Sequence, residues 1–143
     1  MKIALQEAKT AETQGEVPIG AIVVSESGEI ISRGHNLRET LKSPTAHAEH
    51  IAIEKASATL DAWRLCGCTV YVTLEPCIMC AGLMHQARIK RCVFGAYDKK
   101  AGALKTLYEI GSDTRLNHNF EVTGGVLEKE CASLLTNFFK AKR

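Results

Sequence analysis

Hydrophobic positions at the start of the chain change from a helical spacing to a strand spacing. Apolar residues between 3 and 11 recur at helical intervals, and this pattern ends at Gly15. The run 17–24 (VPIGAIVV) then predicts a buried strand, and 30–34 (IISRG) predicts its hairpin partner across a short polar turn. The polar, irregular segment 36–44 follows, and it is typical of a loop that lines a binding site.

The remaining pattern predicts strands and helices in alternation. Strands are expected at 69–74, 92–96 and 120–125, and helices at 47–60, 76–89, 103–110 and 126–143. The first of these helices is expected to begin near Thr45, which is a candidate side-chain cap. The β-branched run 69–74 indicates a central strand. This order predicts an α/β fold, a three-layer α/β/α sandwich around a mixed five-stranded sheet.

Length and composition favour one globular domain over residues 1–143, with 45% hydrophobic and 24% charged residues. No apolar run approaches the roughly 20 residues of a membrane helix, so no membrane contact is expected. The first residues do not resemble a signal peptide, and we therefore expect a cytoplasmic protein with reduced cysteines. Four cysteines are interpreted as small core residues: Cys66, Cys68, Cys92 and Cys131.

The net charge of +2 does not by itself indicate a nucleic-acid-binding protein. Basic residues are nevertheless clustered in one internal segment and at the end of the chain: Lys90, Arg91, Lys99, Lys100 and Lys105, then Lys140, Lys142 and Arg143. Such clusters are compatible with phosphate contacts or with a solvated face, and charge alone leaves both interpretations open.

Two short motifs, HAE and PCIMC, supply three soft metal ligands and one carboxylate. His47 and Glu49 can both approach one site if they lie at the start of a helix. Cys77 and Cys80 follow Pro76 at a spacing that puts both sulfurs on one face of a helical first turn. A structural zinc site normally has four protein ligands, whereas a catalytic site leaves one position for water. Three ligands therefore favour a catalytic zinc site.

The pairing of H-x-E with P-C-x-x-C is the established signature of the zinc nucleobase deaminases. Zinc lowers the pKa of its water, and Glu49 is expected to transfer the proton during hydrolytic deamination. Two other interpretations are weaker. A redox cysteine pair does not explain the HAE motif, and a structural zinc site leaves Glu49 without a role. The structural site would also need a fourth ligand, such as Cys66, Cys68, Cys92, Cys131 or His50.

Longer stretches around these motifs resemble the bacterial tRNA-specific adenosine deaminase family, within the cytidine deaminase-like superfamily. They are GEVPIGAIVV, TAHAE, YVTLEPCIMCAGLMHQARI, VFGAYD, LNH and GVLEKECASLLTNFF. The resemblance implies a hydrolase that converts adenosine to inosine at the wobble position (34) of tRNA and releases ammonia. In bacteria the substrate is chiefly the arginine tRNA. Alternatives are a deaminase of free bases or nucleosides, such as guanine or cytosine, and a non-catalytic, zinc-stabilised RNA-binding module.

The resemblance also implies the roles of individual residues. One Zn²⁺ per subunit would be held by His47, Cys77 and Cys80, and Glu49 would be the catalytic proton shuttle. The substrate-binding residues would be Asn36, Ala48, Asp98 and Lys100. Without the resemblance, the sequence favours the interpretation of Asn36 as a turn residue, and of Asp98 with Lys100 as a solvated turn.

The partners that the resemblance implies are the anticodon stem-loop of a tRNA and a second copy of the chain in a homodimer. Two features depart from the family pattern. His50 stands where an aliphatic residue is commoner, and it is interpreted as a partly exposed helix residue. The segment 103–113 replaces a stretch with more Gly and Ser, so its RNA contacts are not assigned.

Overall fold

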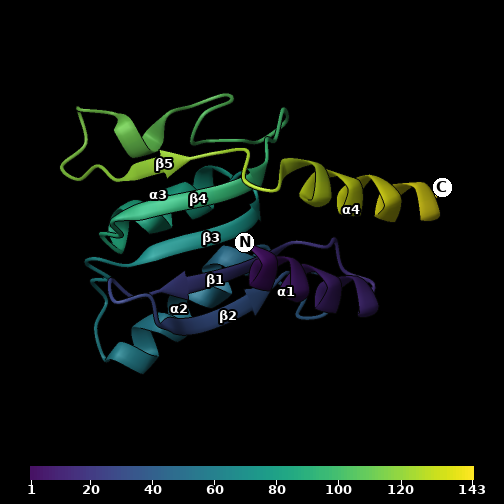
Figure 1. Cartoon of the computed structure of the whole chain (residues 1–143), viewed down its shortest axis with the longest axis horizontal. Helices are drawn as coiled ribbons and strands as arrows, with labels where there is room; N and C mark the ends of the chain where they lie inside the picture. Colours follow the sequence, from purple (N-terminus) through teal and green to yellow (C-terminus); the bar gives the residue numbers. More distant parts are fainter.

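Five strands form one mixed sheet in the computed structural model, which describes residues 1–143 (Figure 1). The elements are α1 (Lys2–Thr13), β1 (Gly20–Val24), β2 (Ile30–His35), α2 (Ala48–Leu60), β3 (Thr69–Leu74), α3 (Ile78–Gln86), β4 (Arg91–Ala96), a 3₁₀ turn η1 (Ile110–Ser112), β5 (Glu121–Thr123) and α4 (Glu128–Ala141). None of the helices combines the length and apolarity that a membrane span requires.

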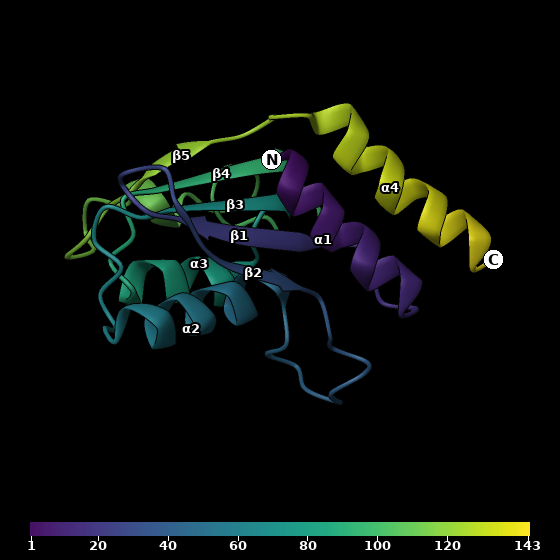
Figure 2. The same ribbon diagram turned by 60° about the horizontal axis from the view of Figure 1, so that its bottom comes forward.

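The strand order β2-β1-β3-β4-β5 confirms the predicted mixed sheet. Strand β1 is antiparallel to both β2 and β3, whereas β3, β4 and β5 run parallel. Helices α2 and α3 cover one face, and α1 and α4 lie on the other (Figure 2). The predicted three-layer α/β/α arrangement is therefore confirmed.

Chain direction brings both sequence motifs to one edge of the sheet. Parallel strands β3 and β4 are aligned at Leu74 and Ala96, so the residues that follow them leave the sheet side by side. Because β1 is antiparallel to β3, it is the beginning of β1, at Gly20, that lies at this edge. The end of β2 lies there too, since His35 pairs with Gly20. The edge therefore collects four separate chain segments.

Close packing between β2 and α2 fixes where the first motif lies. A Cβ atom on Gly34 would come within 2.7 Å of the Ala48 carbonyl oxygen and 2.8 Å of the Ala52 nitrogen. Only glycine therefore allows α2 to approach this strand so closely. The core between this helix layer and the sheet contains the fully buried side chains of Ile53 and Phe94.

The prediction of a helix at 103–110 is wrong. This segment forms turns, followed by η1 at Ile110–Ser112. The backbone amides of Lys105 and Thr106 donate to the buried Glu75 carboxylate, at 3.4 and 3.1 Å, and not to carbonyl groups four residues earlier. A distant side chain therefore overrides the helical spacing of the apolar residues.

Thr45 does not cap α2, contrary to the prediction. Its hydroxyl lies 3.0 Å from the Ser43 hydroxyl, and the residue preceding the helix is His47 in an extended conformation. The helix begins at Ala48, three residues later than expected. Its last residue, Leu60, lies where the sequence placed it.

Among the cysteines assigned to the core, Cys68, Cys92 and Cys131 are buried, as predicted. Cys66 is exposed, so that assignment was wrong. It lies in the short loop that precedes β3, outside the apolar pattern of the strand. Whether each of these cysteines is buried therefore depends on its position relative to the sheet, and not on apolar neighbours in the sequence.

Candidate active site

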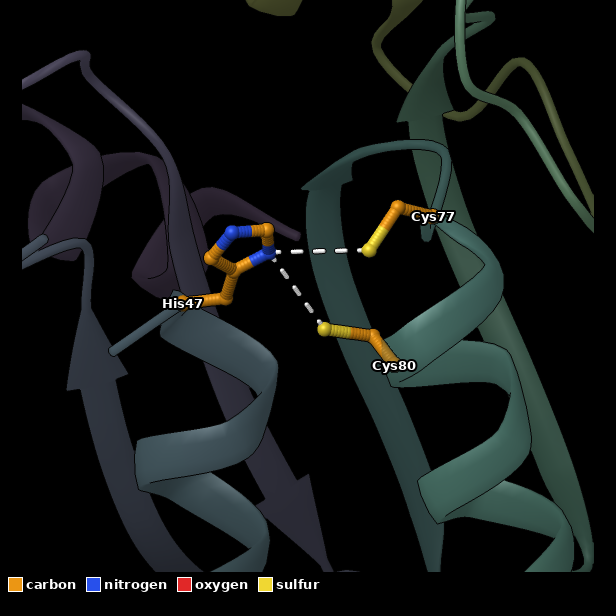
Figure 3. A group of neighbouring side chains, drawn as sticks. All are labelled: His47, Cys77 and Cys80. Atoms are coloured by element: carbon orange, nitrogen blue, oxygen red, sulfur yellow. Dashed lines mark hydrogen bonds between the residues drawn. The ribbon is translucent and has the colours of Figure 1, made fainter. Parts of the chain in front are cut away.

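His47, Cys77 and Cys80 converge from the starts of two neighbouring helices (Figure 3). His47 immediately precedes α2, Cys77 precedes α3, and Cys80 lies in the first turn of α3. The imidazole Nδ1 atom lies 3.6 Å from each sulfur. The three donor atoms all lie within 4.8 Å of one another. The structure thus brings together the three residues that the sequence predicted as ligands.

This donor set fits zinc. A tetrahedral ion with Zn–S bonds near 2.3 Å and Zn–N bonds near 2.1 Å separates a nitrogen and a sulfur ligand by about 3.6 Å. That is the separation found between His47 Nδ1 and both sulfurs. No other His, Cys, Asp or Glu joins the group, so the protein supplies three ligands. A structural site with a fourth protein ligand from Cys66, Cys68, Cys92, Cys131 or His50 is not formed.

The two sulfurs share one proton unequally. The hydrogen bond from Cys80 and, to a smaller extent, the bond to His47 together lower the pKa of the Cys77 thiol to about 4. The pKa of Cys80 is raised, because it donates to the Cys77 thiolate and because it is buried. Cys77 is therefore ready to act as a thiolate ligand at neutral pH.

Glu49 lies in the first turn of α2 and is 4% exposed. Burial is the main influence on its carboxyl group and raises its pKa to about 7, although the charge of His47 acts in the opposite direction. The carboxyl group faces the Cys80 thiol, and a hydrogen bond between them contributes to both pKa values. Its hydrogen-bond partners are its own backbone amide and Cys80, and neither belongs to a loop. A buried carboxyl group of this kind can exchange protons near neutral pH.

A pocket of about 600 Å³ opens onto His47, Cys77 and Glu49, with Cys80 buried behind them. Its lining includes all the residues that the sequence assigned to substrate binding: Asn36, Ala48, Asp98 and Lys100. Ala48 is fully buried between His47 and Glu49, whereas Lys100 is exposed at the pocket mouth. The volume is within the range of small-molecule sites, about 300–1,000 Å³.

Asn36 and Asp98 shape the loops that carry them. The Asn36 side chain accepts a hydrogen bond from the Arg38 amide and donates one to the Val17 carbonyl, at 3.1 and 3.2 Å. Asp98 Oδ1 accepts from the amides of Lys100 and Ala101. The turn-forming interpretation of Asn36 therefore agrees with these contacts, and one of its two amide hydrogens remains for a ligand.

Several lining residues were not assigned from the sequence. They are Val17, Ile19, Arg38, Leu74, Glu75, Tyr97, Lys99, Ala101, Leu135 and Phe139. A structural role for Glu75 could have been predicted from the sequence, because a carboxylate at the end of a central β-branched strand must be buried and hydrogen-bonded. Phe139 is 48% exposed and lines the pocket, whereas Phe138 beside it is buried. Successive helix residues point about 100° apart, so α4 buries only one of them.

The basic cluster predicted from the sequence is divided between two ends of the sheet. Lys99 and Lys100 follow the end of β4 and line the pocket. Lys90 and Arg91 lie at the other end of β4, where Lys90 Nζ is 3.3 Å from a Glu26 carboxylate oxygen. Of these two pairs, only Lys99 and Lys100 lie where they could contact a phosphate group at the pocket.

Comparison with known proteins identifies the family. The family model described as cytidine and deoxycytidylate deaminase zinc-binding region matches residues 1–96. A tRNA-specific adenosine deaminase from Bacillus subtilis is 52% identical over all 143 residues and 88% of its own length. The chain belongs to the tRNA-specific adenosine deaminases.

Solved structures agree with this family membership. A structure from a study of A-to-I editing by tRNA:A34 deaminases at the wobble position has a TM-score of 0.90 and 42% identity, and the match covers 94% of this chain and 97% of that one. A guanine deaminase from Bacillus subtilis has a TM-score of only 0.63 and 32% identity, over 74% of this deaminase and 78% of that chain. The whole length of the chain thus resembles the tRNA deaminases more than this base deaminase.

Proposed function

We propose that this protein deaminates adenosine to inosine at the wobble position, position 34, of a tRNA. One observation carries the proposal. His47, Cys77 and Cys80 supply three zinc ligands beside a buried Glu49, beneath a pocket of about 600 Å³, in a chain that belongs to the tRNA-specific adenosine deaminases. Water and adenosine are converted to inosine and ammonia, as C6 of the base gains an oxygen and loses its amino group.

Zinc, when bound, provides a water molecule of lowered pKa as a nucleophile near neutral pH. His47 Nδ1, Cys77 Sγ and Cys80 Sγ would hold the ion, since their separations suit a tetrahedral arrangement. These residues lie on rigid helix starts, so the ligand positions are established before substrate arrives.

Glu49 would transfer the protons of the reaction. Its carboxylate would accept a proton from water and deliver it to the ring nitrogen beside C6, and then to the departing amino group. Support comes from its position. It lies two residues after His47 and lines the pocket, and it does not belong to the group of ligand atoms.

The pocket walls support a nucleotide as substrate in preference to a free base. Lys99 and Lys100 offer positive charge, and Tyr97 and Phe139 offer aromatic surfaces, beside the mouth of the pocket. Unpaired bases of an RNA loop can be splayed out and inserted into such a pocket at low cost. We propose that Asn36 and Ala48 contact the target nucleoside and that Asp98 and Lys100 contact its neighbours. Among tRNAs, the arginine tRNA is the proposed substrate.

The proposal extends to assembly and location. The chain would act as one deaminase domain over residues 1–143, in the cytoplasm where tRNA is present. A homodimer is supported by large apolar side chains that are exposed on α3 and the turns after β4, namely Ile78, Leu107 and Tyr108. Sedimentation of the zinc-loaded protein would give the mass of a dimer if this is correct.

The decisive experiment compares substrates for the purified zinc-loaded protein. An arginine anticodon stem-loop with adenosine at position 34 should yield inosine and one equivalent of ammonia. The matched control carries guanosine at position 34 and should yield none. Release of ammonia from free guanine, cytosine or adenosine, with the adenosine stem-loop left unchanged, would contradict the proposal and favour a base or nucleoside deaminase.

A further inference from the structure

Glu75 is a buried carboxylate that accepts three hydrogen bonds from one loop. It is 2% exposed and follows β3 directly, two residues before Cys77. The Lys105 amide, the Thr106 amide and the Thr106 hydroxyl donate to it, at 3.4, 3.1 and 2.6 Å. Pro76 adds a further link, since its carbonyl accepts from the Ala103 amide at 2.9 Å. The loop after β4 is therefore tied to the strand that leads into the zinc ligands.

Glu16 repeats this arrangement on another loop. It is 1% exposed and lies between α1 and β1. The Glu39 amide, the Thr40 amide and the Thr40 hydroxyl donate to its carboxylate, at 3.2, 2.6 and 2.8 Å. In both cases the donors are a threonine amide, the hydroxyl of that threonine and the amide of the residue before it. Two buried carboxylates thus hold two loops with the same set of donors.

The two loops form opposing walls of the pocket. The loop held by Glu75 begins with Asp98–Ala101, and the loop held by Glu16 includes Asn36 and Arg38. They leave the sheet at β4 and β2, which are separated by β1 and β3. The loop between β2 and α2 forms no helix or strand, and the loop between β4 and β5 forms only the 3₁₀ turn η1. Their shape therefore depends on contacts with the body of the domain.

A carboxylate fixes the conformation of a loop more strongly than a neutral hydrogen-bond acceptor does. Its two oxygens can accept several hydrogen bonds at once, and charge makes each bond stronger. Burial alone would raise the pKa of Glu16, but the hydrogen bonds from Thr40 and Glu39 outweigh it, so the pKa is lowered. Loss of the carboxylate would leave three buried donors without a partner, which is costly. Each loop is therefore held in one conformation before RNA binds.

We propose that Glu16 and Glu75 are positioning residues for RNA recognition, each holding one wall of the pocket in the conformation that receives the nucleotides around the target base. This inference rests on the proposed function of the site. Neither residue takes part in the chemistry. Their effect is on substrate binding, so it should change KM more than kcat.

The test uses threonine variants that keep the loop amides in place. Thr106→Val and Thr40→Val each remove one hydroxyl donor and preserve the shape of the side chain. We expect each to raise KM for the adenosine stem-loop by about tenfold, with kcat changed less than about twofold and zinc content unchanged. Thr106→Ser and Thr40→Ser restore the hydroxyl and should restore KM. Thr10→Val is the matched control, because its hydroxyl donates to the Gln6 carbonyl on the exposed surface of α1.

Hydrogen exchange gives a second measurement that does not depend on activity. Glu75→Gln should speed amide exchange in 98–106 and leave 36–40 unchanged, while Glu16→Gln should do the reverse. If the wild type makes no inosine, the proposed function fails, and exchange still tests the loops. Equal losses of thermal stability with unchanged KM, failure of the serine variants to restore KM, or faster exchange throughout the domain would each overturn the inference.

Discussion

Glu49 and Glu75 line the pocket, and Glu16 holds a loop that forms one of its walls; the surroundings of these three buried carboxylates divide them into two kinds. Glu16 and Glu75 each accept three hydrogen bonds from a loop, whereas Glu49 accepts none from a loop. The exposed fractions are nearly equal, at 1%, 2% and 4%. Burial therefore does not distinguish them. The difference lies in the donors that the fold places around each carboxyl group.

The same side chain acquires two different protonation properties in this fold. Hydrogen bonds to the charged form lower the pKa of Glu16, so this carboxylate stays ionised and holds its loop. At Glu49, burial outweighs the hydrogen bonds from its own backbone amide and from Cys80 and raises the pKa to about 7, which leaves this group able to take up and release a proton. The carboxylate that holds a loop is suited to structure, and the carboxyl group that no loop occupies is suited to proton transfer.

The largest effect is expected from Glu49→Ala. Loss of a proton shuttle should reduce kcat on the stem-loop by about 10²- to 10⁴-fold, while one zinc per chain and the thermal midpoint are kept. Inosine formation, metal analysis and thermal unfolding measure these quantities. Cys77→Ser is the matched comparison, because it removes a ligand and should lose zinc and stability together. Loss of zinc from Glu49→Ala would assign Glu49 to the ligands and remove the distinction.

A smaller effect is expected from Gly102→Ala, which tests the space around Glu75. A Cβ atom on Gly102 would overlap the Glu75 carboxylate and approach the Asp98 carbonyl oxygen. Forced displacement of this kind should lower the free energy of unfolding by about 1–3 kcal/mol in urea denaturation. In the double variant with Glu75→Ala the losses should be less than additive, because the overlapping side chain is gone. Strict additivity would show that the two residues do not compete for space.

The smallest effect concerns the pH dependence of stability. Because the folded pKa of Glu16 is lowered, the unfolded state binds the proton more readily, and the stabilisation is present above the ordinary pKa near 4.5. It is lost as pH falls through the lowered folded pKa. Glu16→Gln should therefore show a shallower loss of stability on acidification, by up to about 1.4 kcal/mol per pH unit. Urea unfolding between pH 6 and 3 measures both slopes, and identical slopes would contradict the role of this carboxylate.

Local sequence predicted the strands better than the loops. The β-branched run 69–74 coincides with β3, and the ends of α2 and β4 differ from prediction by only a few residues. The strands β3 and β4 are largely apolar runs that are buried on both faces, and such runs predict central strands of a sheet. The segment 103–110 also has a helical spacing, yet it forms turns because Glu75 binds its amides. That competitor lies about thirty residues away in the chain, where no local pattern reports it.

Residue types and their spacing are enough to predict the chemistry of the site. The types and spacing of His47, Glu49, Cys77 and Cys80 require two helix starts and give three soft ligands with one spare acid, because ligand preference and helix geometry are local properties. Which buried carboxyl groups hold a loop depends on the folded structure. The sequence shows Glu16, Glu49 and Glu75 as glutamates of the same kind, and the donors to Glu16 and Glu75 come from loops distant in the chain. The protonation and purpose of each carboxyl group depend on those contacts, which exist only once the sheet has brought the loops together.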